Sequence, residues 1–217
     1  MNKQATDNPT LEATRLIREQ LTAVSKDVVA DIYDAHPSHW EPFGPTGREK
    51  SVRDARYHLT YLIEALEASD PTLFTEYIAW VKVLFAGLNL PDDALSTTLR
   101  SMSTVLKKTL PAEMWSAVSP YLKAGLDQCA QAPSQLPSFL PTDTPLSKLA
   151  HAYLDALLKG QRHIASQLII DAVEEGAPIK EIYLNVFQPV QREVGRLWQQ
   201  NQVSVAQEHY CTAATQL

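Results

Sequence analysis

Apolar residues recur at intervals of three and four along most of this 217-residue chain, and the clearest runs cover residues 59–66 and 74–81. An α-helix places residues with this spacing on one face, where they can enter a core. The chain contains only seven glycines and few stretches in which β-branched and polar residues alternate, as strands would require. The spacing therefore predicts an all-α protein without strands.

A proline-rich segment divides the helical pattern into two parts. The stretch "AQAPSQLPSFLPTDTPLS", residues 130–147, contains four prolines and several small polar residues, which is typical of a linker or of a strap laid over a surface. We expect a helical domain over residues 1–130, the linker over 131–146, and a second domain over 147–217. The second domain has four short amphipathic patterns with turns at Gly160, Gly176 and Asn201, which predicts a four-helix bundle.

Several residues predict where helices begin, bend or end. A long helix is expected over residues 11–33. Asp70, just before a proline, is placed to cap the helix over 74–81, and Ser204 with Gln207 fits a capping box at the start of the last helix. Pro120 is expected to bend or break its helix, and Pro189 to kink the third helix of the bundle, because proline lacks a backbone donor.

Composition excludes several classes of function. The formal net charge is -6 and there is no dense Lys/Arg cluster, so a nucleic-acid partner is not expected. Cys129 and Cys211 lack metal-ligand spacing and are expected to be reduced thiols, which favours a cytoplasmic protein. No apolar segment is long enough to cross a membrane. His36 and His39 are expected to be solvated loop residues rather than a metal pair.

Trp198 precedes an adjacent acid and imidazole, Glu208 and His209, by ten residues. The capping box places the acid and the imidazole in the second turn of the last helix, so the three side chains can converge at one end of the bundle. An aromatic plane beside a carboxylate and an imidazole suits a large flat ligand. The alternative is a tryptophan of the core with an acid and an imidazole on a solvated face.

The second domain resembles the helical cap that precedes the cobalamin-binding Rossmann domain of corrinoid proteins. The resemblance covers residues 146–217 and rests on "LLKG", "GAPIKEIY", "QPVQREVGRLW" and "VSVAQEHY". The Trp and Glu-His spacing is similar to that of the subset that senses light through adenosylcobalamin. The resemblance implies that Trp198 covers the upper corrin face and that Glu208 and His209 contact the adenosyl group. It also implies a lining of neighbouring residues, namely Phe187, Val194 and Val205.

The chain departs from that family in two respects. Gln199 stands where some of these sensors have a histidine that captures cobalt, and the family's Asp-x-His-x-x-Gly loop, which binds the lower face, is not found. We therefore expect a Rossmann cobalamin-binding domain or an effector downstream as the partner, together with homo-oligomerisation. The sequence stops within a predicted helix, so a further segment is expected, and the 217 residues alone are expected to retain cobalamin weakly or not at all.

The first domain resembles globin-like helical sensor modules of bacteria, through "RDARYHLTYLIEALEASDPTLFTEYIAWVKVLFAGLNLPDDALSTTLRSMSTVL". Some relatives of this arrangement hold a bilin such as biliverdin as a second chromophore. The resemblance implies tetrapyrrole contacts by His58, Arg56, Tyr57 and Tyr61. The alternative for His58 is a packing residue on an amphipathic helix.

Three functions are compatible with these patterns. The first is a cobalamin-dependent, light-responsive regulatory protein that is not an enzyme. The second is the corrinoid shuttle component of a methyltransferase, whose cap would cover a methyl group and need no acid for a ribose. The third is a ligand-free interaction module in which both helical domains serve as docking surfaces.

Overall fold

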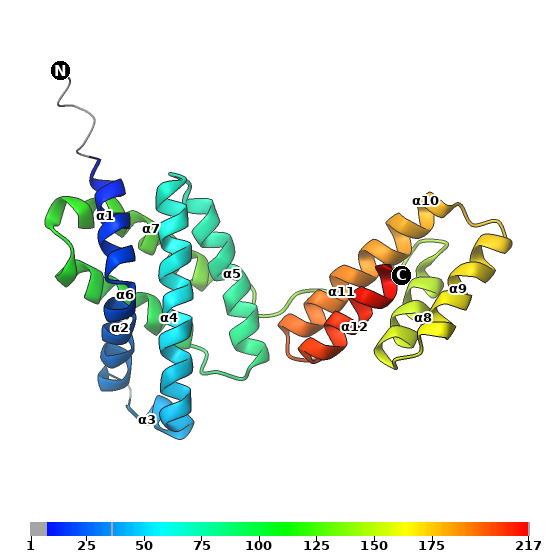
Figure 1. Ribbon diagram of the computed structural model, residues 1–217, viewed down its shortest axis with the longest axis horizontal. Coiled ribbons are helices and arrows are strands. Elements are labelled where there is room, and N and C mark those ends of the chain that lie inside the picture. The colour runs from blue at the N-terminus through cyan, green and yellow to red at the C-terminus, as the bar shows by residue number, and fades with distance from the viewer. Residues whose placement is uncertain (1–7, 36, 217) are drawn as a thin grey trace, which may run out of the picture. The chain divides into compact units, whose positions relative to one another are not determined.

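The computed structural model describes residues 8–35 and 37–216, and every regular element in these residues is a helix (Figure 1). The predicted all-α fold is confirmed, with a globin-like helical domain followed by a helical bundle. The chain divides into two compact units, residues 1–134 (unit 1) and 135–217 (unit 2). Among the described residues, no helix is both long and apolar enough to span a membrane.

Unit 1 is built around the long helix α4, which packs against α1, α2 and α5. Leu59 and Leu62 of α4 are fully buried, as are Phe74 and Ile78 of α5, so both predicted apolar faces enter one core. The elements of unit 1 are α1 (Pro9–Glu19), α2 (Leu21–Ala35), α3 (Pro37–Trp40), the 3-10 turn η1 (Glu41–Phe43), α4 (Gly44–Glu67), α5 (Pro71–Gly87), α6 (Ala94–Thr109) and α7 (Ala112–Gln131).

The single long helix predicted over residues 11–33 is wrong, because the chain changes direction at Gln20. Gln20 has φ -103° and ψ 12°, outside the helical region. The change gives the two halves different neighbours: α1 packs on α4 and α7, whereas α2 packs on α4 and α6. Ile17 of α1 and Val28 of α2 are both buried in the same core, so tertiary packing overrides the continuous helical pattern.

The predicted helix boundaries depend on side-chain caps, and these are present. Asp70 Oδ1 accepts a hydrogen bond from the backbone N–H of Thr72 at 2.8 Å. At the start of the last helix, the backbone N–H of Ser204 donates to Gln207 Oε1 at 2.9 Å and the backbone N–H of Gln207 donates to Ser204 Oγ at 3.2 Å, which completes the capping box. Helix α7 runs through Pro120 without a break.

Unit 2 is a bundle of four main helices with its own core. Its elements are α8 (Ser147–Leu158), α9 (Arg162–Glu174), the short α10 (Ile179–Ile182), the π-helical turn η2 (Tyr183–Phe187), α11 (Gln188–Gln199) and α12 (Val205–Gln216). The turns fall where the sequence predicts them, and Gly160, Gly176 and Asn201 all have positive φ. The left-handed backbone at the ends of α8, α9 and α11 explains these residue types.

The irregularity predicted at Pro189 takes the form of the π-helical turn η2. Proline cannot donate to the carbonyl four residues earlier. Immediately before it, the backbone N–H of Gln188 donates to Tyr183 O, five residues back. The wider turn leads α10 into α11 without ending the helical path, and it keeps Val186 and Val190 in the core of unit 2.

Candidate functional site

Trp198 lies in the last turn of α11 and is half-buried. The turn behind it is closed by the backbone N–H of Asn201, which donates to Trp198 O at 2.9 Å, and by that of Gln202, which donates to Leu197 O at 2.8 Å. Val194, one helical turn earlier, is fully buried in the core of unit 2. Part of the surface of Trp198 therefore stays accessible at the end of a helix whose preceding turn is anchored in the core.

Glu208 and His209 lie at the start of α12, directly after that turn. The side chain of Glu208 is 26% exposed and that of His209 is 76% exposed. His209 Nδ1 lies 2.5 Å from Glu208 Oε2, and Thr212 Oγ1 lies 3.1 Å from Glu208 Oε1. Each oxygen of the carboxylate therefore has one partner. Because a carboxylate offers about four acceptor positions, Glu208 can still bind two donors.

The structure brings only part of the predicted lining to this end of unit 2. Val205 opens α12 and is 52% exposed. Val194 is fully buried in the core of unit 2, so its side chain has no exposed surface with which to line a ligand. Phe187 precedes α11, about 16 Å from Trp198 by helical rise, and its ring packs on Tyr153 with ring centroids 5.4 Å apart.

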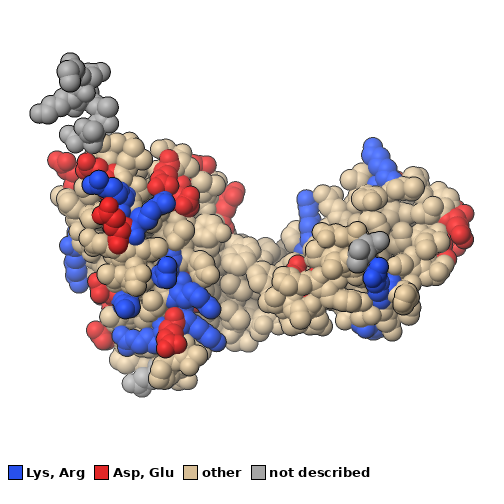
Figure 2. All heavy atoms as spheres, in the orientation of Figure 1, with Lys and Arg blue, Asp and Glu red and all other residues tan. Residues whose placement is uncertain are grey.

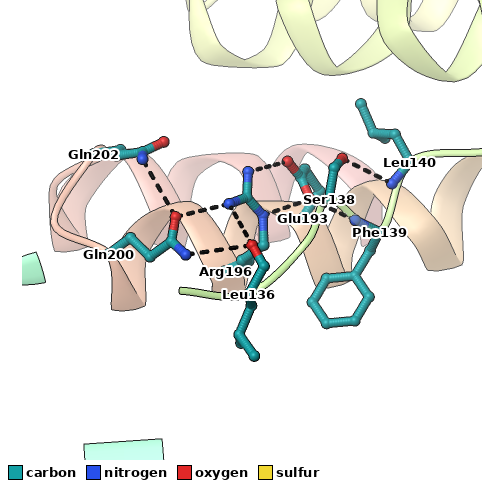
Figure 3. A network of polar contacts seen from close by, with 8 residues as sticks. All are labelled: Leu136, Ser138, Phe139, Leu140, Glu193, Arg196, Gln200 and Gln202. Atoms are coloured by element: carbon teal, nitrogen blue, oxygen red, sulfur yellow. Dashed lines mark hydrogen bonds and ion pairs between the residues drawn. The ribbon is translucent and has the colours of Figure 1, made fainter. Parts of the chain in front are cut away.

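A buried ion pair in α11 holds the proline-rich segment on unit 2 (Figure 3). Arg196 donates to both carboxylate oxygens of Glu193, at 2.6 and 2.9 Å, and the backbone N–H of Phe139 donates to Glu193 Oε2 at 2.8 Å. Arg196 also donates to Gln200 Oε1 at 2.7 Å and to Leu136 O at 3.3 Å. Residues 136–140, here called the strap, are thereby attached to the helix that carries Trp198.

Opposing effects set the pKa of Glu193. Burial raises the pKa of this carboxyl, but the hydrogen bonds from Arg196 and from the backbone of Phe139 outweigh it and hold the pKa below its usual range. Glu193 is therefore charged at neutral pH, and the strap is held by a charge-assisted contact. Sequence patterns gave no signal for the attachment of the strap, because Phe139 and Leu136 lie more than fifty residues from Glu193 and Arg196 in the chain.

In unit 1, the residues predicted to contact a tetrapyrrole do not converge. His58 is 2% exposed, whereas Tyr57 is 56% exposed and Arg56 is exposed as well. Tyr61 stacks on Tyr77 with ring centroids 3.7 Å apart, and Tyr77 OH lies 2.8 Å from His58 Nδ1. Grouping Arg56 and Tyr57 with His58 around one ligand is therefore wrong, since the helix points them to different sides.

His58 instead lines a cavity of about 290 Å³ in unit 1. Burial lowers the pKa of His58 to about 4, so the imidazole is neutral at pH 7. Asp54 and Ser51, one and two turns earlier on the same face of α4, line the same cavity. Burial raises the pKa of Asp54, against the lowering effect of Arg53. The spacing of four between Asp54 and His58 was the signal available in the sequence.

Trp40 forms part of the wall of this cavity and carries an unused donor. Its side chain is buried, and its indole Nε1–H has no acceptor among the described residues. An unpaired buried donor costs free energy unless a ligand or water accepts from it. The cavity therefore offers one indole donor, the Asp54 carboxyl and the His58 imidazole within largely apolar walls, which include Phe85 and Ile32.

Other predicted features lie elsewhere. Cys129 is buried beside a second cavity of unit 1, about 690 Å³, which contains none of the predicted site residues. Cys211 is a core residue of unit 2.

His36 lies outside the described residues, as does the His39 side chain, and no group of three or more potential metal ligands occurs in the described part of the chain. Figure 2 shows acidic and basic side chains interspersed over the visible face of unit 1.

Comparison with known protein families gives two matches. Residues 2–128 match the family model described as phycobilisome protein. Residues 149–217 match the model described as B12 binding domain, which supports cobalamin binding by unit 2. A search of curated proteins and a search of solved structures each gave no significant match.

Proposed function

The chain belongs to the phycobilisome protein family, and from this together with its B12 binding domain we propose that it is a light-responsive regulatory protein without enzymatic activity. In this proposal, unit 2 covers the upper face of adenosylcobalamin through Trp198, Glu208 and His209. The observation that carries it is the Glu208 carboxylate, which is half-buried, has one partner on each oxygen, and follows the short turn after the helix that carries Trp198.

The residues present fit such a ligand. Glu208 retains acceptor positions for two hydroxyl groups, as a ribose presents, and charge-assisted hydrogen bonds of this kind are strong. His209 is exposed and tied to Glu208, so it can turn its other ring nitrogen toward the ligand. The half-buried indole of Trp198 provides an apolar surface that excludes water from the ligand's upper side.

Adenosylcobalamin supplies a cobalt–carbon bond that visible light breaks. Unit 2 shields that bond with Trp198 and holds the nucleoside through Glu208, so it binds the ligand less tightly once the nucleoside is gone. A Rossmann cobalamin-binding domain would cover the lower face of the corrin. Loss of the nucleoside would remove the hydrogen bonds at Glu208 and would thereby change how unit 2 contacts that partner or a second copy of the chain.

Tryptophan signals provide a direct binding assay. The chain has four tryptophans, of which only Trp198 lies in unit 2, so its indole N–H signal in a nitrogen-15 NMR spectrum reports ligand binding there. Trp198→Ala is expected to weaken adenosylcobalamin binding at least tenfold, measured by calorimetry, because a large apolar contact is lost. Glu208→Gln is expected to weaken adenosylcobalamin binding about tenfold and to leave methylcobalamin binding unchanged.

The control is Glu174→Ala, which removes an exposed acid of unit 2 far along the chain from the site. Equal binding of methyl- and adenosylcobalamin with methyl transfer to an acceptor protein would instead identify a methyltransferase shuttle. No binding of either corrinoid, with a Rossmann cobalamin-binding domain supplied, would identify a ligand-free interaction module. Light-induced change in oligomeric state of the adenosylcobalamin complex, measured by gel filtration, is the result the proposal requires.

A bilin is the second ligand we propose, in the cavity of unit 1. The Asp54 carboxyl and the neutral His58 suit the pyrrole nitrogens, and Trp40 donates to a carbonyl of the ligand. The volume of about 290 Å³ lies at the small end of ligand pockets, so only part of a bilin is enclosed. Neither cysteine lines this cavity, and the ligand is therefore held without a covalent bond.

Reconstitution with biliverdin tests this second ligand. The chain is expected to elute from gel filtration with bound visible absorbance. Ser51→Trp should abolish the colour by filling the cavity, whereas Tyr57→Ala should retain it, because Tyr57 lies on an exposed face of α4. Thermal unfolding of both variants checks that they fold. Colour that survives Ser51→Trp, or that is lost with Tyr57→Ala, contradicts the assignment of the cavity.

A further inference from the structure

A chain of hydroxyl and amide groups connects Glu208 to two other helices of unit 2. Thr212, one turn after Glu208 on α12, lies 3.1 Å from Glu208 Oε1 and 3.1 Å from Gln191 Oε1 of α11. Gln191 Nε2 donates to Thr215 Oγ1 at 2.8 Å, and Tyr153 OH of α8 donates to the same hydroxyl at 3.1 Å. The carboxylate is thus linked to side chains on α11 and α8.

The Thr212 hydroxyl has one proton and two acceptors. It can donate to the Glu208 carboxylate or to the Gln191 carbonyl, but not fully to both. The carboxylate is the stronger acceptor because it is charged. The Thr212 proton therefore goes to Glu208 Oε1 and, together with His209 at Oε2, fixes the position of the carboxylate.

We propose that Thr212, supported by Gln191, is a positioning residue that makes unit 2 select corrinoids whose upper ligand carries hydroxyl groups. This inference rests on the proposed function of Glu208. It adds that the selectivity among corrinoids depends on the Thr212 hydroxyl, which need not touch the ligand.

The positions of Glu208, Thr212 and Gln191 explain why the selection needs this hydrogen-bonded network. Glu208 belongs to the first turn of α12, and a helix end is held less firmly than a helix middle. Thr212 lies a full turn further in, and Gln191 lies inside α11. The hydrogen bonds from these two helices therefore hold the Glu208 carboxylate in one position. A carboxylate that is fixed in advance loses less conformational entropy when it binds a ligand.

The test compares Thr212→Val, which keeps the shape and removes the hydroxyl, with Thr212→Ser, which keeps the hydroxyl. Adenosyl-, methyl- and cyanocobalamin are titrated into the full chain with a Rossmann cobalamin-binding domain supplied, and the Trp198 indole signal gives each dissociation constant, with Trp40, Trp80 and Trp115 as internal references. We expect Thr212→Val to weaken adenosylcobalamin binding about tenfold and to change methyl- and cyanocobalamin binding less than twofold. Thr212→Ser should behave as the unsubstituted chain.

Three results would overturn the proposal, and they are distinguishable. If the unsubstituted chain binds all three corrinoids equally or binds none, the proposed function itself fails and the positioning role falls with it. If the unsubstituted chain prefers adenosylcobalamin and Thr212→Val keeps that preference, only the positioning role is wrong. If Thr212→Val weakens all three corrinoids alike while Thr212→Ser does not, Thr212 supports the fold of unit 2 and does not select the ligand.

Discussion

Replacing Glu193 with Ala is expected to lower the free energy of unfolding of unit 2 by about 3 kcal/mol. The substitution leaves the guanidinium of Arg196, whose side chain is 13% exposed, without its carboxylate partner. It also removes the acceptor for the backbone N–H of Phe139. Because both groups lose a partner at sites with little water, the cost is that of a broken buried pair rather than that of a surface salt bridge.

Urea titration followed by the Trp198 indole signal measures this loss in unit 2, while the other three tryptophans report unit 1. Hydrogen exchange at the amide of Phe139 should accelerate as the strap detaches. Arg196→Ala and the double variant complete a cycle, in which the double variant is expected to lose less than the sum of the two. Glu174→Ala is the surface control. An unfolding free energy within 1 kcal/mol of the original for Glu193→Ala contradicts a stabilising role for the pair.

Unit 1 is expected to lose about 3 kcal/mol of stability as the pH falls from 7 to below 4, because of His58. The pKa of the folded imidazole is lowered to about 4 by burial, whereas an unfolded histidine titrates near 6.5. The unfolded state therefore binds a proton first. The contribution of neutral His58 to the stability of unit 1 is complete above about pH 6.5 and is lost as the pH falls toward 4. About 2 kcal/mol of this loss occurs between pH 7 and pH 5.

The test is the unfolding free energy of unit 1 at pH 7 and pH 5, in the original chain and in His58→Gln. Glutamine can still accept a hydrogen bond from Tyr77 but does not titrate. The raised pKa of Asp54 has the opposite effect, since the folded state then binds a proton before the unfolded one. That effect is present in both proteins and cancels in their difference. An equal decrease of stability in both proteins would show that His58 is not the source.

The helices of this protein follow from local signals, and the exceptions have tertiary causes. The caps at Asp70 and Ser204 involve residues two and three positions apart, so the sequence alone predicted them. The break at Gln20 has no such signal, because it depends on which helices the two halves of the segment pack against. The turn η2 is intermediate, since Pro189 predicts an irregularity but not its π-helical form.

The candidate sites likewise combine residues that local sequence patterns predict with residues that only tertiary packing brings together. Trp198, Glu208 and His209 lie on either side of one short turn, and a sequence pattern can place them at one end of the bundle. The sequence did not predict that Thr212 and Gln191 hold Glu208 in place, since Gln191 lies on another helix than Thr212. In unit 1, the sequence pointed to His58 but grouped it with the exposed Arg56 and Tyr57. Only the packing of α2, α3 and α5 around α4 defines the cavity wall.

Contacts between Trp198 and the nucleoside of adenosylcobalamin test the central claim most directly. Nuclear Overhauser effects can be measured between the indole protons of Trp198 and the adenine and ribose protons of the bound ligand, with a Rossmann cobalamin-binding domain present to cover the lower face. The account predicts such effects for Trp198 and none for Trp40, Trp80 or Trp115. Binding of adenosylcobalamin without any contact between its nucleoside and Trp198 would contradict it.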